Sequence, residues 1–286
     1  MHELINQISR VAVVDESTLQ GMQQEVLSLA EPWTRVYNDY HSGGWWTVSL
    51  LNNTSNPHDA LIEDCVPIET SLLAKMPITR GFLQSLGLRY MWVRLAKLEP
   101  NSFMWEHCDY QELEDVQRYR LHVPIITNPD SSLIINTAKV HLDTGYIWKL
   151  NPTHRHAAGN FGSEARIHIL MDCYLNSALE NMLNSEELDD SCIVELPATA
   201  NSTLGHAVDT CEGLVKMGYN TVAEHHLLKM YHLYNLEQGR GYDLVSEMYE
   251  ALNDEERKEL WQSNKAKFLG QEQIDIPATR SDSLPA

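Results

Sequence analysis

The sequence has few basic residues for its length. Its 286 residues include 21 Lys and Arg against 40 Asp and Glu, which gives a formal net charge of -19. Nucleic acids and anionic membranes bind proteins through basic surfaces. The charge therefore argues against both kinds of partner.

The patterns of disulfide frameworks, zinc sites and membrane spans are missing as well. The five cysteines are odd in number and form no Cys-x-x-Cys pair, which is typical of reduced cytosolic thiols. No apolar stretch approaches the roughly 18 residues of a membrane span. The first residues, MHELINQISR, lack the apolar segment of a signal peptide. We expect a cytoplasmic protein that does not cross a membrane.

Several apolar patterns indicate elements of secondary structure. A short strand is expected over residues 8–14, and helices over 15–30 and 69–86. From 89 to 174, short apolar runs alternate with Pro, Gly, Asn and Asp turn signals. This alternation predicts an all-β barrel or a double-sheet roll.

The pattern changes again after residue 176, where apolar and charged residues follow a helical period. We therefore predict a β-rich domain with N-terminal helices over 1–176 and a helical region over 177–275. The residues 276–286 contain two prolines and two serines and are expected to form a loose tail.

Two pairs of polar residues stand two positions apart in the β-rich part. His107 and Asp109 form the first pair, and Arg120 and His122 form the second. On a strand, residues at this spacing point to the same face. A His-x-carboxylate pair with a distant histidine is the facial triad of non-haem Fe(II) sites, which leaves open positions for a 2-oxo acid and O₂. The first pair therefore suggests a metal site.

The His-x-Asp pattern is weak alone, and the chain contains another, His141 and Asp143. That second pair runs into a Thr-Gly turn, so we interpret it as a strand end and a turn former. The third ligand should come from a later strand, where NPTHRHAAGN offers His154 and His156. Both would face the same side of an extended segment, so the spacing leaves the choice open.

Arg166 stands at the start of the apolar stretch IHILMD. A buried guanidinium is costly unless it is paired. It either forms a salt bridge within the protein or binds a dicarboxylate whose other end lies on the metal. The spacing favours neither reading.

Five stretches occur in the order and spacing of a known family: YNDYHSGGW (37–45), VRLAKLEPNSFMWEHCDYQELE (93–114), YRLHVPI (119–125), GYIWKLNPTHRHAAGNF (145–161) and ARIHILMDCY (165–174). With them, the chain resembles the Fe(II)/2-oxoglutarate-dependent hydroxylases of the aspartyl/asparaginyl β-hydroxylase-like group. Within that group it is similar to the bacterial L-proline cis-3- and cis-4-hydroxylases. The C-terminal stretch LLKMYHLYNLE (227–237) resembles their helical extension. The likeness implies a double-stranded β-helix, that is, a cupin-like jelly-roll core with a helical C-terminal region.

The resemblance also implies roles for individual residues. His107, Asp109 and His156 would hold Fe(II), which resolves the choice against His154, and Arg166 would bind 2-oxoglutarate. Arg94, Lys97 and His122 occupy positions expected to contact the cosubstrate. Arg120, Trp105 and Tyr110 occupy positions expected to contact the substrate, although Trp105 fits a core position equally well.

The implied activity is hydroxylation of an unactivated C–H bond in a free amino acid or similar molecule, with O₂ and 2-oxoglutarate consumed and succinate and CO₂ released. One alternative is the same chemistry on an Asp, Asn or other residue of a peptide, or on a natural-product intermediate. Another is a cupin-like metal-binding protein without oxidative turnover, for which Arg166 would have no purpose. A homodimer is conceivable on this reading.

Overall fold

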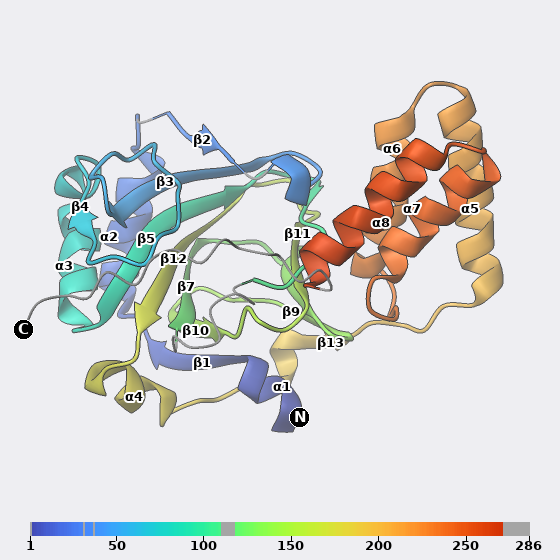
Figure 1. Ribbon diagram of the computed structural model, residues 1–286. Coiled ribbons are helices and arrows are strands. Elements are labelled where there is room, and N and C mark those ends of the chain that lie inside the picture. The colour runs from blue at the N-terminus through green and yellow to red at the C-terminus, as the bar shows by residue number, and fades with distance from the viewer. Residues whose placement is uncertain (1, 31, 37, 110–117, 271–286) are drawn as a thin grey trace, which may run out of the picture.

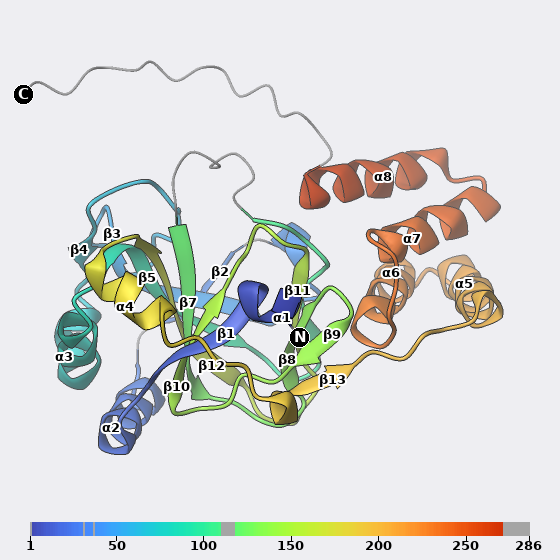
Figure 2. The same ribbon diagram turned by 90° about the horizontal axis from the view of Figure 1, so that it is seen from below.

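The computed structural model describes residues 2–270, apart from Glu31, Tyr37 and 110–117. Two antiparallel sheets face each other in this part of the chain (Figure 1). Helices cover the outer face of the larger sheet, and a helical bundle lies beyond the smaller one, as Figure 2 also shows. The layers thus run from helices through two sheets to the bundle.

The larger sheet has the strand order β1-β10-β7-β12-β5-β3-β2, with β4 paired to β3. Its described strands are β1 (Ile8–Val13), β2 (Thr34–Arg35), β3 (Trp45–Asn52), β4 (Ile68–Glu69), β5 (Arg89–Leu98), β7 (Arg118–Ile126), β10 (Tyr146–Leu150) and β12 (Arg166–Tyr174).

The smaller sheet has the order β13-β9-β8-β11-β6. Its strands are β6 (Ser102–Phe103), β8 (Ser131–Ile135), β9 (Ala138–Val140), β11 (His156–Asn160) and β13 (Ile193–Glu195). From β5 to β12 the chain passes repeatedly between the two sheets, as in a jelly roll. The predicted double-stranded β-helix with a helical C-terminal region is therefore confirmed.

The described helices are α1 (His2–Gln7), α2 (Glu16–Leu27), α3 (Pro77–Ser85), α4 (Ser177–Leu183), α5 (Asn201–Lys216), α6 (Asn220–Lys229), α7 (Arg240–Ala251) and α8 (Glu255–Leu269), with 3₁₀ turns η1 (Asn38–Tyr40), η2 (Leu73–Lys75), η4 (Asp190–Cys192) and η5 (Met230–His232). Asp15 caps α2 by accepting a hydrogen bond from the Thr18 amide. None of the described helices is both long and apolar enough to cross a membrane.

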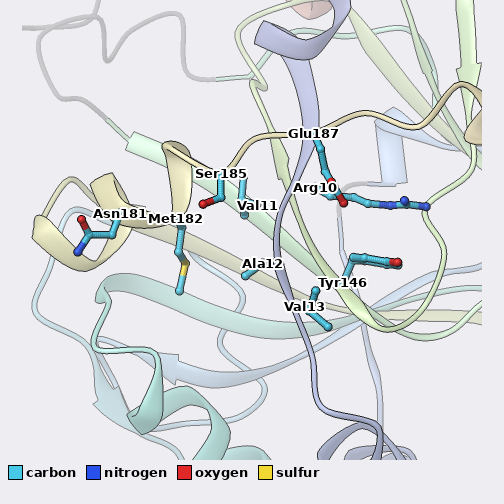
Figure 3. Close-up of a pocket in the computed structure, with 9 residues that line it drawn as sticks. All are labelled: Arg10, Val11, Ala12, Val13, Tyr146, Asn181, Met182, Ser185 and Glu187. Atoms are coloured by element: carbon cyan, nitrogen blue, oxygen red, sulfur yellow. The ribbon is translucent and has the colours of Figure 1, made fainter.

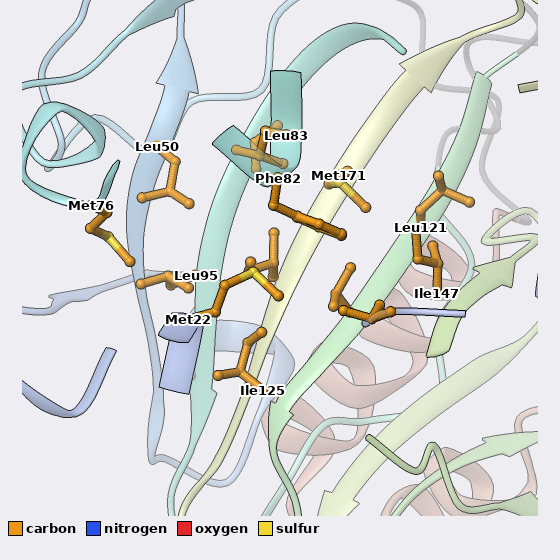
Figure 4. Close-up of a cluster of buried hydrophobic side chains, with 14 of the residues drawn as sticks. Met22, Leu50, Met76, Phe82, Leu83, Leu95, Leu121, Ile125, Ile147 and Met171 are labelled. Carbon is orange, nitrogen blue, oxygen red and sulfur yellow. The ribbon is translucent and has the colours of Figure 1, made fainter. Parts of the chain in front are cut away.

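The largest apolar core lies between the larger sheet and the helices α2 and α3. Figure 4 shows part of this core, in which Met22 of α2 and Phe82 of α3 meet Leu95, Leu121 and Met171 of three neighbouring strands. Burial of such side chains contributes about 1.5–3 kcal/mol each. This layer fixes the sheet from outside and leaves its inner face for other uses.

The inner face of the larger sheet is polar where the central strands meet. On β12, Ile167, Ile169 and Met171 belong to the outer core, whereas the alternating residues Arg166 and Asp172 are also buried. Because successive strand residues point to opposite faces, these two polar side chains face the space between the sheets. Four of the predicted site residues come from this inner face, namely Arg94, Arg120, His122 and Arg166.

The helical bundle of α5 to α8 has its own apolar core, which includes Leu227, Val245 and Trp261. The sequence placed the change from the β-rich part at residue 176, but β13 lies beyond it and pairs with β9 in the smaller sheet. The bundle itself begins at Asn201. The predicted tail over 276–286 lies outside the described residues.

Candidate metal and cosubstrate site

His107, Asp109 and His156 form a group that could hold a metal ion, because one ligand atom from each lies within 4.8 Å of the others. His107 Nε2 is 3.8 Å from Asp109 Oδ1, and His156 Nε2 is 4.0 Å from Asp109 Oδ2. An antiparallel bridge between His107 and His156 brings the two histidines together, with mutual backbone hydrogen bonds of 2.9 Å. Two histidines and one carboxylate match the donors of a facial Fe(II) triad.

Both histidine rings are oriented for metal binding by the same local contact. The Nδ1 atom of His107 lies 2.7 Å from the Trp105 carbonyl, and Nδ1 of His156 lies 2.8 Å from the His154 carbonyl. Since a carbonyl only accepts, Nδ1 carries the proton in each neutral ring and Nε2 keeps its lone pair. Each imidazole therefore presents a bare nitrogen toward Asp109.

The protonation states also suit a cation. Burial, helped by the nearby His107, lowers the pKa of His156 to about 3, so its ring is neutral at physiological pH. Burial alone would raise the pKa of Asp109, but Arg120 and the two histidines hold it below its usual value. The group thus offers a carboxylate and a neutral imidazole without prior loss of a proton.

The choice between the two histidines of NPTHRHAAGN follows from their exposure. His156 is buried at the start of β11, whereas the side chain of His154 is exposed. The second His-x-Asp pair has structural contacts, as interpreted from the sequence: His141 Nδ1 lies 2.8 Å from the Ser131 carbonyl, and Asp143 pairs with Arg10.

Arg166 is 4 % exposed, and among the described residues it has no salt bridge to a carboxylate. Its guanidinium contacts the ring of His168 at 2.9 and 3.0 Å. Burial lowers the pKa of Arg166 to about 10, which still leaves it charged. A neutral imidazole has one acceptor nitrogen, so His168 cannot satisfy this cation as a carboxylate would. Of the two alternatives for Arg166, the intramolecular salt bridge is therefore not seen within the described residues.

His122 lies in the same interior. The residue is buried, with 4 % of its surface exposed. Neither ring nitrogen has a hydrogen-bond partner among the described atoms. Burial lowers the pKa of His122 well below its usual value, and the charges of Arg166 and Arg120 lower it further. A buried imidazole without a partner costs free energy, so a bound polar group would stabilise it.

Residues 13–175, more than half of the chain, match the model of the family described as aspartyl/asparaginyl beta-hydroxylase. The chain belongs to this family. Membership confirms the predicted enzyme class, a hydroxylase of the Fe(II)/2-oxoglutarate-dependent dioxygenases, and the triad and Arg166 provide donors suited to these groups.

Individual relatives of this hydroxylase are distant. The L-proline cis-4-hydroxylase of Rhizobium meliloti (strain 1021) is 23 % identical over 260 residues, which cover 85 % of this chain and 89 % of that protein. Among solved structures, a prolyl-4-hydroxylase of Pseudomonas putida matches 62 % of this chain and 97 % of its own at 13 % identity and a TM-score of 0.41. An oxidoreductase of the 2OG-Fe(II) oxygenase family from Burkholderia pseudomallei matches 56 % and 79 % at 13 % identity and a TM-score of 0.39.

The two basic residues predicted on β5 lie on opposite faces in this hydroxylase. Arg94 is buried on the inner face, with its guanidinium 4.5 Å from the ring of Trp92. Lys97 is on the other face, where its ammonium pairs with Glu99 at 2.8 Å and lies 5.0 Å from the ring of Trp33. The interior position agrees with a cosubstrate contact for Arg94, whereas the placement of Lys97 does not support the contact predicted for it.

The three residues predicted to contact substrate have different surroundings. Arg120 is buried and binds Asp109 and Asp172, so its predicted substrate contact stays a prediction. Trp105 packs in the apolar core that the bundle shares with Phe103, and its indole N–H donates to the Asp39 carbonyl at 2.8 Å. This is the core position that the sequence left open. Tyr110 lies outside the described residues.

Sequence reasoning missed two buried partners on β12, Asp172 and His168. Asp172 accepts two hydrogen bonds from Arg120, at 2.9 and 3.2 Å, and His168 contacts Arg166. Both stand in the apolar run after Arg166 at even spacing from it. Because alternate strand residues share a face, this even spacing indicates that Asp172 and His168 lie on the same face as Arg166.

A surface hollow elsewhere contains none of these residues (Figure 3). It lies where β1 meets α4 and is lined by residues such as Val11, Tyr146 and Met182. The guanidinium of Arg10 points away from it and pairs with Asp143. The hollow therefore has no part in the candidate site.

Proposed function

We propose that this hydroxylase inserts one oxygen atom of O₂ into an unactivated C–H bond of a free amino acid or similar small molecule. The other oxygen atom enters 2-oxoglutarate, which loses CO₂ and leaves as succinate. The observation that carries the proposal is Arg166, a buried cation without a carboxylate partner among the described residues. It lies on the inner face of the sheet whose Arg120 binds Asp109 of the His-Asp-His triad.

In this proposal His107, Asp109 and His156 hold Fe(II) through two Nε2 atoms and one carboxylate oxygen. When bound, Fe(II) supplies the activation of O₂ that the protein's side chains cannot provide. The carboxylate of Asp109 also favours hydroxylation over halogenation, because it occupies a position that a halide would need. The carbonyls of Trp105 and His154 keep both rings in the tautomer that binds metal.

The cosubstrate's distal carboxylate would pair with Arg166. A planar guanidinium can bind a carboxylate through two parallel hydrogen bonds, which an ammonium cannot do. His168 orients the guanidinium from one side, and the unpartnered ring of His122 offers one donor to the same ligand. Arg94 adds a further positive charge to this interior.

The substrate class rests on the curated relative. That protein is named an L-proline cis-4-hydroxylase, and the likeness spans most of both chains. Arg94 is a further buried cation beside the cosubstrate-binding Arg166, which favours substrates with a carboxylate. Free L-proline and other small imino and amino acids are therefore the first candidates.

A peptide substrate is the second candidate, because the matching family is described by aspartyl and asparaginyl hydroxylation. A free amino acid presents its own carboxylate to the interior cations, whereas an internal peptide residue does not. The two candidates are distinguished by comparing each amino acid with a short peptide that contains it.

The test has two stages. Anaerobic addition of Fe(II) and then 2-oxoglutarate should produce a weak visible charge-transfer band, which the His107→Ala variant should lack. Succinate release in air is then screened by mass spectrometry against L-proline, other free amino acids and peptides. Absence of the band in the wild type would overturn the proposed site, and a band with turnover of peptides alone would overturn the small-molecule substrate.

A further inference from the structure

The segment 104–108, which contains His107 and precedes Asp109, lies between β11 and the helical bundle. On the β11 side, the Met104 amide donates to the Ala158 carbonyl at 2.7 Å, and His107 exchanges two hydrogen bonds of 2.9 Å with His156. The β-pairing of this segment with other described residues consists of isolated bridges at Met104 and His107, so it is not a regular strand. Its other side needs support from elsewhere.

The bundle contacts every second residue of this segment through hydrogen bonds. The ring of His232 in η5 binds the Met104 carbonyl through Nε2 at 2.9 Å. The Tyr242 hydroxyl of α7 donates to the Glu106 carbonyl at 2.6 Å. The Cys108 amide donates to the carbonyl of Phe268, near the end of α8, at 2.9 Å. Figure 1 shows this end of α8 beside β11.

Glu106 joins the segments that carry His107 and His156 to the bundle. One oxygen of its buried carboxylate accepts from the Gly239 amide, at the start of α7, at 2.9 Å. The other oxygen binds Arg155, the neighbour of the ligand His156, at 3.3 Å. Glu106 therefore connects the segments that carry His107 and His156 with α7.

The two parts fit too closely for a side chain at Gly159 in β11. A Cβ atom there would lie 3.0 Å from Nδ1 of His232 and 2.9 Å from the ring of Phe161. Aromatic contacts continue to the ligands, since the ring of Tyr40 is 4.3 Å from Phe268 and 5.9 Å from His107. The bundle is thus packed tightly against the metal-binding segment.

We propose that the helical bundle is a positioning element for the metal site, and that Tyr242 and Glu106 are its positioning residues. The bundle holds the backbone of 104–108 so that His107 faces His156 before any metal arrives. Without the Tyr242 contact, part of the metal's binding free energy would be used to order this segment. The inference rests on the proposed metal site, but it concerns metal affinity and not turnover.

A pair of tyrosines in α7 gives a matched test. Tyr242 and Tyr249 are both fully buried and both use their hydroxyls, but Tyr249 donates at 2.8 Å to Glu224 inside the bundle. The variant Tyr242→Phe removes the hydrogen bond to Glu106, and Tyr249→Phe removes the bond to Glu224 together with one of 3.3 Å from Arg257. Binding of Mn²⁺ is measured by electron paramagnetic resonance of the free ion, and thermal unfolding of the metal-free protein is measured in parallel.

We expect Tyr242→Phe to weaken Mn²⁺ binding about five-fold, which corresponds to one hydrogen bond of about 1 kcal/mol. Both tyrosine variants should lower the melting temperature by a similar amount. Tyr249→Phe, however, should leave Mn²⁺ affinity at the wild-type value. Glu106→Gln, which loses its charge toward Arg155, should also weaken Mn²⁺ binding. Equal Mn²⁺ affinities in the two tyrosine variants would overturn the inference.

The His107→Ala variant separates this inference from the proposed site. If His107→Ala binds Mn²⁺ as well as wild type, the proposed metal site is wrong. If His107→Ala loses Mn²⁺ binding while Tyr242→Phe and Glu106→Gln retain wild-type affinity, the metal site stands and the role of the bundle is wrong.

Discussion

Arg120 and Asp172 stand directly opposite each other on the antiparallel strands β7 and β12, and Arg120 also binds the ligand Asp109. Asp172 is fully buried and accepts from Nε and Nη2 of Arg120, at 2.9 and 3.2 Å. One guanidinium thus connects a carboxylate of the sheet interior with a carboxylate of the metal site. Arg120 therefore orients Asp109, and Asp172 in turn holds Arg120 in place.

We expect Asp172→Asn to lower the free energy of unfolding by about 3–5 kcal/mol, because it leaves the buried Arg120 without its two-pronged partner. Asp143→Asn is a matched control, since Asp143 also pairs with a strand arginine, Arg10, but its side chain is 35 % exposed. That change should cost no more than about 1 kcal/mol. Urea unfolding of the metal-free proteins measures both, and equal losses would contradict the assignment.

Alanine in place of any one of His107, Asp109 and His156 should weaken metal binding by more than about 100-fold, since loss of residues that merely support ligands costs 10–100-fold. The variants should remain folded. His154→Ala is the control, because that side chain is exposed. Calorimetric titration with Ni²⁺ measures the affinities. A His154→Ala variant that loses metal while His156→Ala keeps it would refute the ligand set.

Arg166→Ala should raise the dissociation constant for 2-oxoglutarate by a factor of hundreds, as expected for a broken buried pair of about 3–5 kcal/mol. Arg166→Lys should fall between, since an ammonium makes one contact where a guanidinium makes two. Metal affinity without cosubstrate should stay nearly unchanged. Lys97→Ala, on the opposite face of β5, serves as the control and should bind 2-oxoglutarate normally. Wild-type cosubstrate affinity in Arg166→Ala would remove the main physical support for the proposed function.

Acidification should destabilise the metal-free protein below about pH 6.5. His122 and His168 are buried, and burial lowers their pKa well below the usual 6.5, while burial lowers that of His232 to about 4. Each ring stays neutral in the folded protein but takes up a proton in the unfolded chain, so unfolding becomes more favourable as pH falls. At pH 5 each contributes a loss on the order of 2 kcal/mol.

Urea unfolding between pH 7 and pH 5 tests this dependence. His232→Gln should flatten the slope, because it removes one buried group that differs in protonation between the two states. His206→Gln, at an exposed position of α5, should leave the slope unchanged. A free energy of unfolding that is constant over this interval would contradict the expectation.

The closeness of His107 and Asp109 was predictable from their spacing, and strand parity predicts further neighbours. His107 and Asp109 are two apart, and the structure brings them to one group. Arg94 and Lys97 are three apart, so a strand must point them to opposite faces, as β5 does. The same rule predicts that Asp172 and His168 share the strand face of Arg166, because both stand at even spacing from it.

Other features depend on pairings that spacing does not encode. Arg120 and Asp172 are 52 positions apart, and they meet because β7 and β12 pair in one particular register. Glu106 meets the Gly239 amide across 133 positions, through the docking of a bundle on a sheet. Trp105 precedes His107 by two, yet its segment is not a regular strand, so parity misjudged its surroundings.

The contact between Cys108 and Phe268 also sets an order of events during synthesis. The chain is made from its N-terminus, so every strand of the jelly roll emerges before the end of α8. The jelly roll can form early, but the Cys108 amide beside His107 gains its hydrogen bond to Phe268 only after α8 has been synthesised. Iron loading is therefore expected late in the life of the nascent chain. In refolding experiments, tight Mn²⁺ uptake should follow the burial of Trp261 in the bundle rather than accompany the formation of the sheets.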